Sequence, residues 1–332
     1  MKYKKIVQTN IKSIYADKKS DPLSSYSIID KRLIYVGDKL KFDLYINDHT
    51  THMSLFLQSN TIVDKVDKNT LMEIERLYVY KEQKSKYESF IEKRLQDTVE
   101  SSDLSLDDKR DIIYTSTAEL TNSLYENPEA LENAQRSKNI VEPILQSIIR
   151  DDKAIKSFIK IIEYDYYTHT HSLNVSIYSL CLGSQLGLSE EKLNTLGSSA
   201  LLHDLGKSSI NHEILNKNGL LDQFEFLQMK KHPSLGYETA IKIGIKDKNI
   251  LDGIRHHHEK LDGMGYPDGL KGEEITLFPR IIAVCDVFDA LTTRRSYKEA
   301  MNSYDAIYLM KTHMHQHLDM KIVNTFIKML HE

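Results

Sequence analysis

A histidine followed by an aspartate, His203-Asp204 in the stretch ALLHDLGK, is the first candidate for chemistry in this chain of 332 residues. Adjacent residues on a helix point about 100° apart, so both side chains can reach a metal ion held close to the helix, and a carboxylate can bridge two ions. An Asp that follows the apolar run SALL would be costly to bury without a partner. Taken alone, such a pair is more often a helix end at which the Asp caps a neighbouring group.

Other imidazoles and carboxylates occur where helices are expected to begin, end or be buried. His171 opens one expected helix, His232 ends another, and His257 and His258 end a third. Asp286 interrupts the apolar pattern IIAVCDVF, where a charge needs a reason. Helix bundles build metal sites from inward-projecting side chains of this kind. Five imidazoles and two carboxylates suit two borderline first-row divalent ions.

The charges of such a centre favour a phosphate substrate. Two divalent ions, two carboxylates and a bridging hydroxide would leave a net charge of about +1, and two ions about 3.5–4 Å apart can activate the hydroxide and stabilise the attacking and leaving oxygens. The alternatives for the triplet in RHHHEKLDGMGYPDGL are a pH-sensitive patch or a solvated loop, and they stay open at this point.

The first region of the chain, residues 1–82, is predicted to be β-rich. The runs KRLIYV, KFDLYI, MSLFLQS and RLYVYK have the β-branched and aromatic residues of short strands. Gly37-Asp38 and Asn47-Asp48 are typical of the turns between strands. We expect a small sheet or barrel that forms an N-terminal domain, with a sensory or dimerisation role that the sequence does not identify.

Residues 83–150 are predicted to form a helical connector. The stretch YESFIEKRLQDTV has helical spacing, and Ser105 with Asp108 has the pattern of a capping box. Asn127 followed by Pro128 predicts the start of the next helix, because proline is favoured at the first helical position.

Residues 151–332 are predicted to be almost entirely helical. Apolar residues recur at helical spacing in HSLNVSIYSLCLGSQLG, EEKLNTLGSSALLHDLG, DQFEFLQMKKH, DKNILDGIRHHHE, RIIAVCDVFDALTT, SYDAIYLMKTHM and KIVNTFIKMLH. The expected fold class is therefore α+β with segregated domains, in which a small β-rich N-terminal domain precedes an all-α helical bundle.

Composition excludes several classes of protein. The net charge of −4 shows no basic excess, which argues against a protein that binds duplex DNA. Cys181 and Cys285 both lie in apolar helical patterns, which argues against a disulfide framework and for a reducing compartment. No signal peptide is recognised, and no segment is long enough to span a bilayer. We expect a cytoplasmic protein.

From about residue 150 to its end the chain resembles the HD-GYP family, the cyclic di-GMP phosphodiesterase branch of the HD phosphohydrolases. The motifs that carry the resemblance, in order, are YTHTHSLNV, ALLHDLGK, KKHPSLGYE, HHEKLDGMGYPDGLKGEEI and RIIAVCDVFDALTTRRSYKEA. The resemblance implies an HD-type bundle and an enzyme of bacterial second-messenger signalling. Such an enzyme hydrolyses cyclic di-GMP to pGpG through a metal-bridging hydroxide, and further cleavage to GMP is left open.

The resemblance also implies a ligand set. One ion would be held by His171, His203, Asp204 and Asp286, and a second by Asp204 as a bridge with His232, His257 and His258. Relatives with a third ion carry a Glu where this chain has Tyr167, so we expect two divalent ions, with iron or manganese favoured. Lys207 would contact the scissile phosphate or its leaving group beside the catalytic Asp204; its alternative is a solvated lysine at a helix end.

Further residues are implied as substrate contacts. Arg295 and Lys298 match the positions of cationic contacts to substrate phosphate. Gly263 and Gly265 would allow backbone shapes closed to other residues, and Tyr266 would either stack on guanine or pack inside the GYP loop. The GYP loop would also be the contact for a diguanylate cyclase of the GGDEF type or another signalling protein, and the long middle helices would suit a homodimer.

Two alternative functions remain. One is a receptor for cyclic dinucleotides, or a protein-interaction module, with little catalysis; the complete ligand set argues against it. The other is a phosphodiesterase for a different cyclic dinucleotide.

The resemblance gives His256 no ligand role. The late GxxFDP pattern of relatives is reduced here to HQHLDM, which keeps only Asp319.

Overall fold

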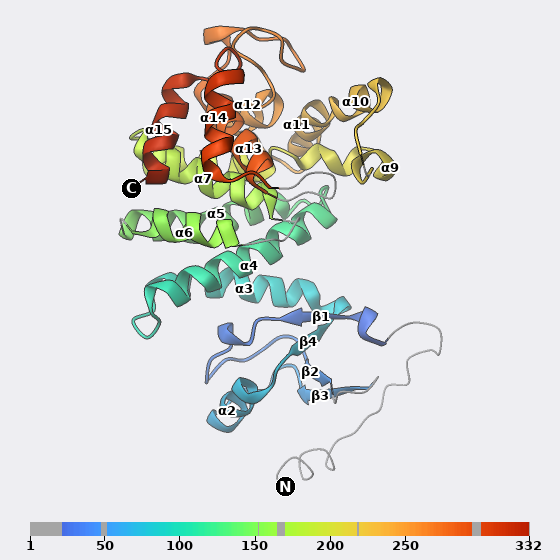
Figure 1. Ribbon diagram of the computed structural model, residues 1–332. Helices are drawn as coiled ribbons and strands as arrows, with labels where there is room; N and C mark the ends of the chain where they lie inside the picture. Colours follow the sequence, from blue (N-terminus) through green and yellow to red (C-terminus); the bar gives the residue numbers. More distant parts are fainter. Residues whose placement is uncertain are drawn as a thin grey trace. The chain divides into compact units, whose positions relative to one another are not determined.

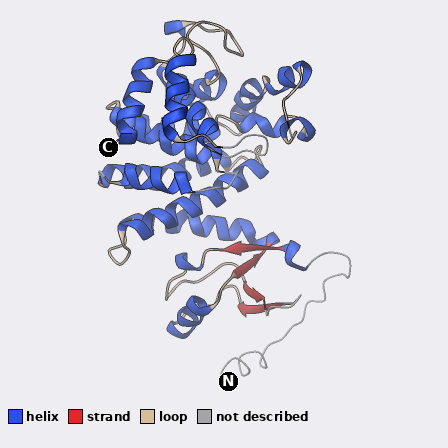
Figure 2. Ribbon diagram, in the orientation of Figure 1, coloured by secondary structure: helices blue, strands red, loops and turns tan. Residues whose placement is uncertain are grey.

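The computed structural model describes residues 22–47, 52–151, 153–164, 170–217, 219–293 and 300–331 (Figure 1). The chain divides into two compact units, Met1–Glu100 and Ser101–Glu332. The predicted fold class is confirmed: the described strands all lie in the first unit, and the second unit is helical (Figure 2).

The first unit contains a four-stranded antiparallel sheet with the order β1-β4-β2-β3. Its strands are β1 (Tyr26–Ile29), β2 (Leu44–Asn47), β3 (Met53–Leu57) and β4 (Leu77–Tyr80), and its α-helices are α2 (Lys65–Glu73) and α3 (Lys84–Glu100). Phe42 and Tyr87, both fully buried, pack edge to face with their ring centroids 5.5 Å apart. The core of this unit thus includes side chains from α3.

One predicted strand in this unit is wrong. The run KRLIYV begins with a short 3-10 helix, η2 (Lys31–Leu33), and the edge strand β1 precedes it. The Asp30 carboxylate accepts hydrogen bonds from the backbone N–H and the side chain of Arg32, which favours a turn over continued pairing. The predicted turn at Gly37 is confirmed, because its φ of 95° lies in the left-handed region. Asp48 lies outside the described residues.

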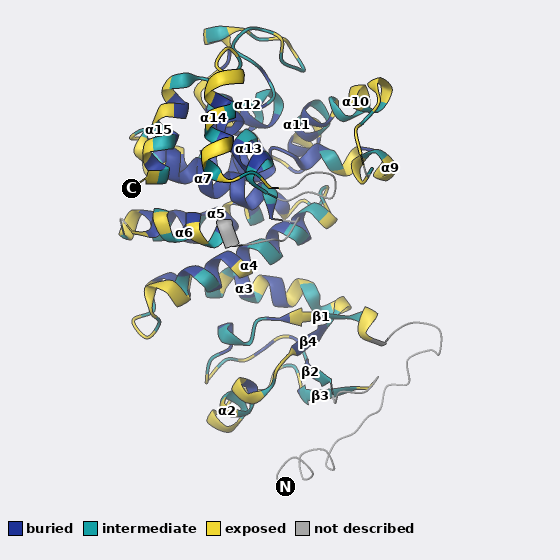
Figure 3. Cartoon of the chain, in the orientation of Figure 1, coloured by how far each residue is buried: buried dark blue, intermediate teal, exposed yellow. Residues whose placement is uncertain are grey.

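The second unit is a bundle whose centre is α7 (Figure 3). Every residue of α7 from Ser172 to Gly183 is buried, and α8, α13 and α15 pack around it. Its α-helices are α4 (Leu106–Glu126), α5 (Asn133–Arg150), α6 (Ala154–Tyr164), α7 (His171–Gln185), α8 (Glu190–Leu202), α9 (His212–Leu215), α10 (Gln223–Met229), α11 (His232–Lys242), α12 (Lys248–His256), α13 (Leu277–Thr292), α14 (Ser303–His313) and α15 (Met320–His331). Short 3-10 helices are η4 (Leu205–Ser209) and η5 (Gly272–Glu274).

The start of α4 is as predicted, but the start of α5 is not. The Ser105 side chain accepts from the backbone N–H of Asp108 and caps α4. Asn127, predicted to open the next helix, instead ends α4, and α5 begins only at Asn133. The Asn133 side-chain amide donates to the carbonyls of Leu124 and Asn127, which binds the intervening turns to the end of α4.

Two boundaries near the candidate site also differ from the prediction. His232 was predicted to end a helix, but α10 ends at Met229 and His232 is the first residue of α11, followed by Pro233. The helix predicted to run through Gly206 stops at Leu202, and η4 follows. Both changes place candidate ligands at helix ends, where the chain direction turns.

Within the part of the chain that the structure describes, no helix combines the length and apolar character needed to cross a bilayer. Cys181 and Cys285 are free thiols, and both are buried in the bundle.

Candidate metal centre

Seven predicted ligands come together inside the bundle. They lie at the start of α7, the end of α8, the start of α11, the end of α12 and the middle of α13. Three overlapping groups have potential ligand atoms within 4.8 Å of one another: His171, His203 and Asp286; His203, Asp204 and His257; and His232, His257 and His258.

Backbone carbonyls fix the orientation of three of these imidazoles. The Nδ1 atoms of His203, His232 and His257 lie 2.7–2.8 Å from the carbonyl oxygen three residues earlier. A carbonyl can only accept, so each Nδ1 is the donor, and a neutral ring then carries its lone pair on Nε2. The Nε2 atoms of all three rings are therefore the atoms that could bind a metal ion.

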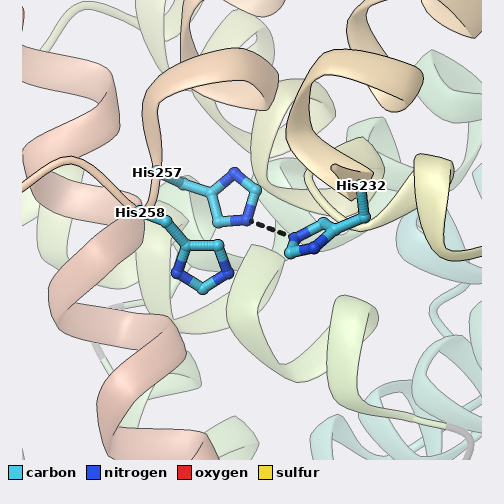
Figure 4. Close-up of side chains that lie close together, drawn as sticks. All are labelled: His232, His257 and His258. Carbon is cyan, nitrogen blue, oxygen red and sulfur yellow. Dashed lines mark hydrogen bonds between the residues drawn. The ribbon is translucent and has the colours of Figure 1, made fainter. Parts of the chain in front are cut away.

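The Nε2 atoms of His232 and His257 lie 3.2 Å apart (Figure 4). Since both Nδ1 atoms donate to carbonyls, each ring would, in its neutral form, present a lone pair to the other. His258 lies beside them, with its ring centroid 4.2 Å from that of His257. A cation placed against these nitrogens satisfies lone pairs that otherwise repel.

Asp204 lies between two sides of the centre. Its Oδ2 atom is 3.5 Å from His171 Nε2 and 3.4 Å from His203 Nε2, whereas its Oδ1 atom is 3.3 Å from His232 Nε2. One carboxylate oxygen thus faces each group of imidazoles, as a bridging ligand requires. The Lys207 ammonium also reaches Oδ2, at 2.5 Å, and its side chain remains 28% exposed.

His171 is held by carboxylates on both ring nitrogens. Its Nε2 lies 3.1 Å from Asp286 Oδ1, and its Nδ1 lies 2.6 Å from Asp289 Oδ2. Asp289 is fully buried and also accepts from the Asn174 amide at 3.1 Å. Sequence reasoning missed Asp289 as a site residue, although its position one helical turn after Asp286 was a signal that both face one side of α13.

The electrostatics of the centre favour the ligand forms of most groups. Burial alone would raise the pKa of Asp204, but His203 and Lys207 hold it well below its usual range. Burial lowers the pKa of His203 and His257, and lowers that of His258 to about 3. Ionised carboxylates and neutral imidazoles are the forms that bind metal ions.

His171 differs from the other imidazoles. Burial alone would lower its pKa, but Asp286 and Asp289 raise it to about 9. Without a metal ion, a proton on His171 therefore compensates the nearby carboxylates. A divalent cation in the same place would take over that role and release the proton.

Unsatisfied polar atoms show that the site fits metal ions. Among the described residues, His171 Nε2, His203 Nε2 and Asp204 Oδ1 are buried and make no contact with hydrogen-bond geometry, although each has a polar partner atom 3.1–3.4 Å away. Such groups are costly to bury unless something binds them. Because nitrogen and carboxylate oxygen ligands at this spacing suit first-row divalent ions, the donor set is chemically consistent with a metal centre.

The GYP loop lies against His258. The Tyr266 ring packs on the His258 ring with centroids 4.8 Å apart, and the Lys230 ammonium lies 5.2 Å from the Tyr266 centroid. At Gly265 a Cβ atom would come within 2.5 Å of Glu259 Cα, so no larger residue fits there. Gly263 has a φ of 82°, which favours glycine.

Two residues at this loop were missed in the sequence. Glu259 is buried, and its carboxylate accepts from the backbone N–H groups of Asp268, Gly269 and Leu270, so it shapes the loop exit. Lys230 was hidden in the pair KK before His232, and its contact with Tyr266 depends on the fold.

Some predicted residues lie elsewhere. His256 Nδ1 is 2.6 Å from Asp252 and its Nε2 is 2.8 Å from Asp268, so both ring nitrogens point away from the centre. Asp319 contacts Arg280 at 3.3 Å and caps the start of α15. Tyr167, Arg295 and Lys298 lie outside the described residues.

Comparisons with known proteins agree on one family. The model of the HD domain family matches residues 124–322. The chain is 36% identical over 200 residues to a cyclic di-GMP phosphodiesterase of Pseudomonas aeruginosa, covering 60% of this chain and 48% of that protein. It is 34% identical over 244 residues to 3'3'-cGAMP-specific phosphodiesterase 3 of Vibrio cholerae, covering 70% of this chain and 51% of that protein.

A further relative and a solved structure are also similar. The cyclic di-GMP phosphodiesterase response regulator RpfG of Xanthomonas campestris pv. campestris is 40% identical over 174 residues, 50% of this chain and 46% of that protein. A solved HDG"Y"P protein from Bdellovibrio bacteriovorus has the same fold, with a TM-score of 0.66 at 19% identity over 92% of this chain and all of that one. The chain spans about half the length of these curated relatives.

Proposed function

This chain belongs to the HD domain family, in its HD-GYP branch, and we propose on that basis that it is a metal-dependent phosphodiesterase that hydrolyses cyclic di-GMP. The observation that carries the proposal is the convergence of five imidazoles and two carboxylates on one buried centre. The names of the relatives from Pseudomonas and Xanthomonas supply the substrate class.

The ligands would divide between two ions, for which iron and manganese are the proposed metals. One ion would be held by His171, His203, Asp204 and Asp286, and the other by Asp204, His232, His257 and His258. Two bound ions would supply a water of lowered pKa and would neutralise charge on the phosphate.

Other side chains of the protein would bind and orient the substrate. The Lys207 ammonium forms an ion pair with the Asp204 carboxylate. Its side chain is partly exposed, so it could turn toward a phosphate oxygen of the substrate. Tyr266 and Lys230 would line the substrate side of His258. Arg295 and Lys298 are proposed as further phosphate contacts. Hydrolysis of one P–O3′ bond, in which a water oxygen bonds to phosphorus and the O3′ leaves as a hydroxyl, would give linear pGpG, and hydrolysis of the second would give two GMP.

The test is turnover of cyclic di-GMP by the full chain after loading with iron or manganese. Linear pGpG should appear in chromatography, followed by GMP if the second bond is cut. The His203→Ala/Asp204→Ala variant should lose activity, while His315→Ala, a change at an exposed histidine, should keep it. Equal activity of the double variant and the wild type would refute the assignment. Binding of cyclic di-GMP without turnover at any metal loading would instead indicate a receptor.

A second candidate substrate is 3'3'-cGAMP. The relative from Vibrio cholerae that carries this specificity in its name aligns with 70% of this chain, more than the Pseudomonas relative does. Turnover rates for cyclic di-GMP and 3'3'-cGAMP, measured on the same metal-loaded preparation, distinguish the two.

We also propose that a GGDEF-type diguanylate cyclase or another signalling protein binds the GYP loop, and that the chain forms a homodimer. Co-purification tests the first proposal, and sedimentation tests the second.

A further inference from the structure

A series of buried hydrogen bonds leads from the candidate centre to α4. His171 Nδ1 lies 2.6 Å from Asp289 Oδ2, Asp289 Oδ1 accepts from Asn174 Nδ2 at 3.1 Å, and Asn174 Oδ1 accepts from the Tyr114 hydroxyl at 2.9 Å. Asp289 is 0% exposed, Asn174 1% and Tyr114 4%. These hydrogen bonds join residues of α13, α7 and α4, which are far apart in the sequence.

The direction of each hydrogen bond follows from donor and acceptor capacity. A carboxylate only accepts, so the Asn174 amide nitrogen and the His171 Nδ1 must be the donors to Asp289. With its nitrogen directed at Asp289, Asn174 presents its oxygen to Tyr114, and the tyrosine hydroxyl donates. A flipped Asn174 would place its oxygen against the Asp289 carboxylate, so that two acceptors would face each other.

The far end of this series of hydrogen bonds is the buried Tyr114 hydroxyl on α4. Tyr114 lines a cleft of about 1000 Å³ whose walls also include Arg110, Lys156, Gln185 and Met329. The near end is the buried Nε2 atom of His171, which lies 3.1 Å from Asp286 Oδ1 in the candidate centre. Between the two ends, each group fixes the orientation of the next.

We propose that Tyr114, Asn174 and Asp289 form a positioning relay through which helix α4 sets how tightly the His171 side of the centre holds its metal ion. A carboxylate on the distal nitrogen of a ligand histidine orients the ring and makes it a stronger ligand. Asn174 holds that carboxylate, and Tyr114 holds Asn174. None of the three belongs to the groups of candidate metal ligands, so they are positioning residues. The inference rests on the proposed function only for the presence of metal ions.

The test is manganese binding to the metal-stripped full chain, with stoichiometry and affinity read by titration calorimetry and metal analysis. Asp289→Asn should weaken one of the two ions by roughly 10- to 100-fold and leave the other unchanged. Tyr114→Phe, which keeps the ring and removes one donor, should weaken the same ion by a smaller factor. Because the residues act in series, Tyr114→Phe/Asp289→Asn should bind no more weakly than Asp289→Asn alone.

Tyr87→Phe is the matched control, since it removes a buried hydroxyl that accepts from Asp30 N–H in the N-terminal unit. It should leave both affinities unchanged. A Tyr114→Phe protein with a lower Tm but unchanged affinities would overturn the relay, as would additive effects in the double variant or equal weakening of both ions. If Asp289→Asn does not fold, Tyr114→Phe decides alone.

The same measurements separate this inference from the proposed function. A wild-type chain that binds two ions and shows the relay effects but does not hydrolyse cyclic di-GMP would refute the proposed function and support the relay. A wild-type chain that binds no divalent ion would overturn both.

Discussion

The three successive histidines at the end of α12 have three different environments. His256 lies between the carboxylates of Asp252 and Asp268. His257 donates to a carbonyl and directs Nε2 toward His232, while His258 packs under Tyr266 with Nδ1 4.0 Å from Asp286. Adjacent residues with the same side chain are thus separated by helix geometry into one surface contact and two candidate ligands.

Single substitutions in this triplet should separate these roles. His256→Ala should leave the metal content of the purified protein nearly unchanged, because both of its ring nitrogens contact carboxylates outside the centre. His257→Ala or His258→Ala should lower it, because each removes a donor from the group around His232. Elemental analysis of protein purified without added metal is the measurement, and equal metal loss in all three variants would contradict the assignment.

The Asp268 carboxylate should make the free energy of unfolding depend on pH, and a single substitution can measure its contribution. Hydrogen bonds from Arg255 and then His256 lower the pKa of Asp268 to about 2, whereas an unfolded Asp has a pKa of about 3.9. The ionised carboxylate therefore stabilises the fold above about pH 4, and this contribution is lost as the pH falls toward 2. The difference in free energy of unfolding between wild type and Asp268→Asn should shrink over that range in urea titrations; a pH-independent difference would count against this pairing.

At the scale of elements, two glycines let η4 approach the start of α11. A Cβ atom on Gly206 would lie 2.0 Å from the His232 carbonyl oxygen and 2.4 Å from Gly236 N. This contact joins the segment that carries His203 and Asp204 to the helix that carries His232. The motifs HDLGK and HPSLGYE therefore contribute to the centre through their glycines as well as through their candidate ligands.

Gly206→Ala should consequently disturb both stability and metal binding. Because the new methyl group meets backbone atoms, we expect a loss of about 3 kcal/mol in the free energy of unfolding, at the upper end for overpacking. The protein should also bind metal more weakly, as His232 moves from Asp204. Gly187→Ala, at a φ of 75° with open space around it, should cost only about 1 kcal/mol and leave metal binding unchanged. Unaltered metal affinity in Gly206→Ala would show that this contact does not position His232.

At the scale of the whole molecule, helices α4 and α5, which precede residue 151, belong to the same compact unit as the candidate centre. The Tyr125 hydroxyl on α4 donates to the carbonyl of Leu201 at 2.8 Å, and Val141 on α5 packs beside Gly197 on α8. The family model likewise begins at residue 124. The prediction of a catalytic domain that starts near residue 151 stays a prediction.

Two fragments test how much of the chain the centre needs. Both 101–332 and 151–332 contain all seven candidate ligands, but only the longer one keeps the buried side chains of α4 and α5, which include Leu120, Leu124, Ile140, Val141, Ile144 and Leu145. Each such side chain contributes about 1.5–3 kcal/mol by burial. We expect cooperative thermal unfolding and metal binding of 101–332, and neither of 151–332. A shorter fragment that unfolds cooperatively with two bound ions would contradict this.

The sequence by itself determined the fold class and identified the seven candidate ligands together with the family they resemble. These features follow from local patterns: apolar residues at helical spacing, β-branched and aromatic residues in short strands, and motifs in a fixed order. The sequence was least informative at boundaries such as Asp30, Asn127 and His232, where a side-chain hydrogen bond or a neighbouring proline decides between competing local structures.

Only the tertiary structure decided how the ligands are held. Asp289 reaches both His171 and Asn174 across more than a hundred residues of sequence, and Tyr114 contacts Asn174 from a helix outside the motifs. The same holds for the contact between Gly206 and the start of α11, and for the Nε2 atoms of His232 and His257 that face each other. Such contacts depend on how whole helices pack, and residue spacing carries no record of that packing.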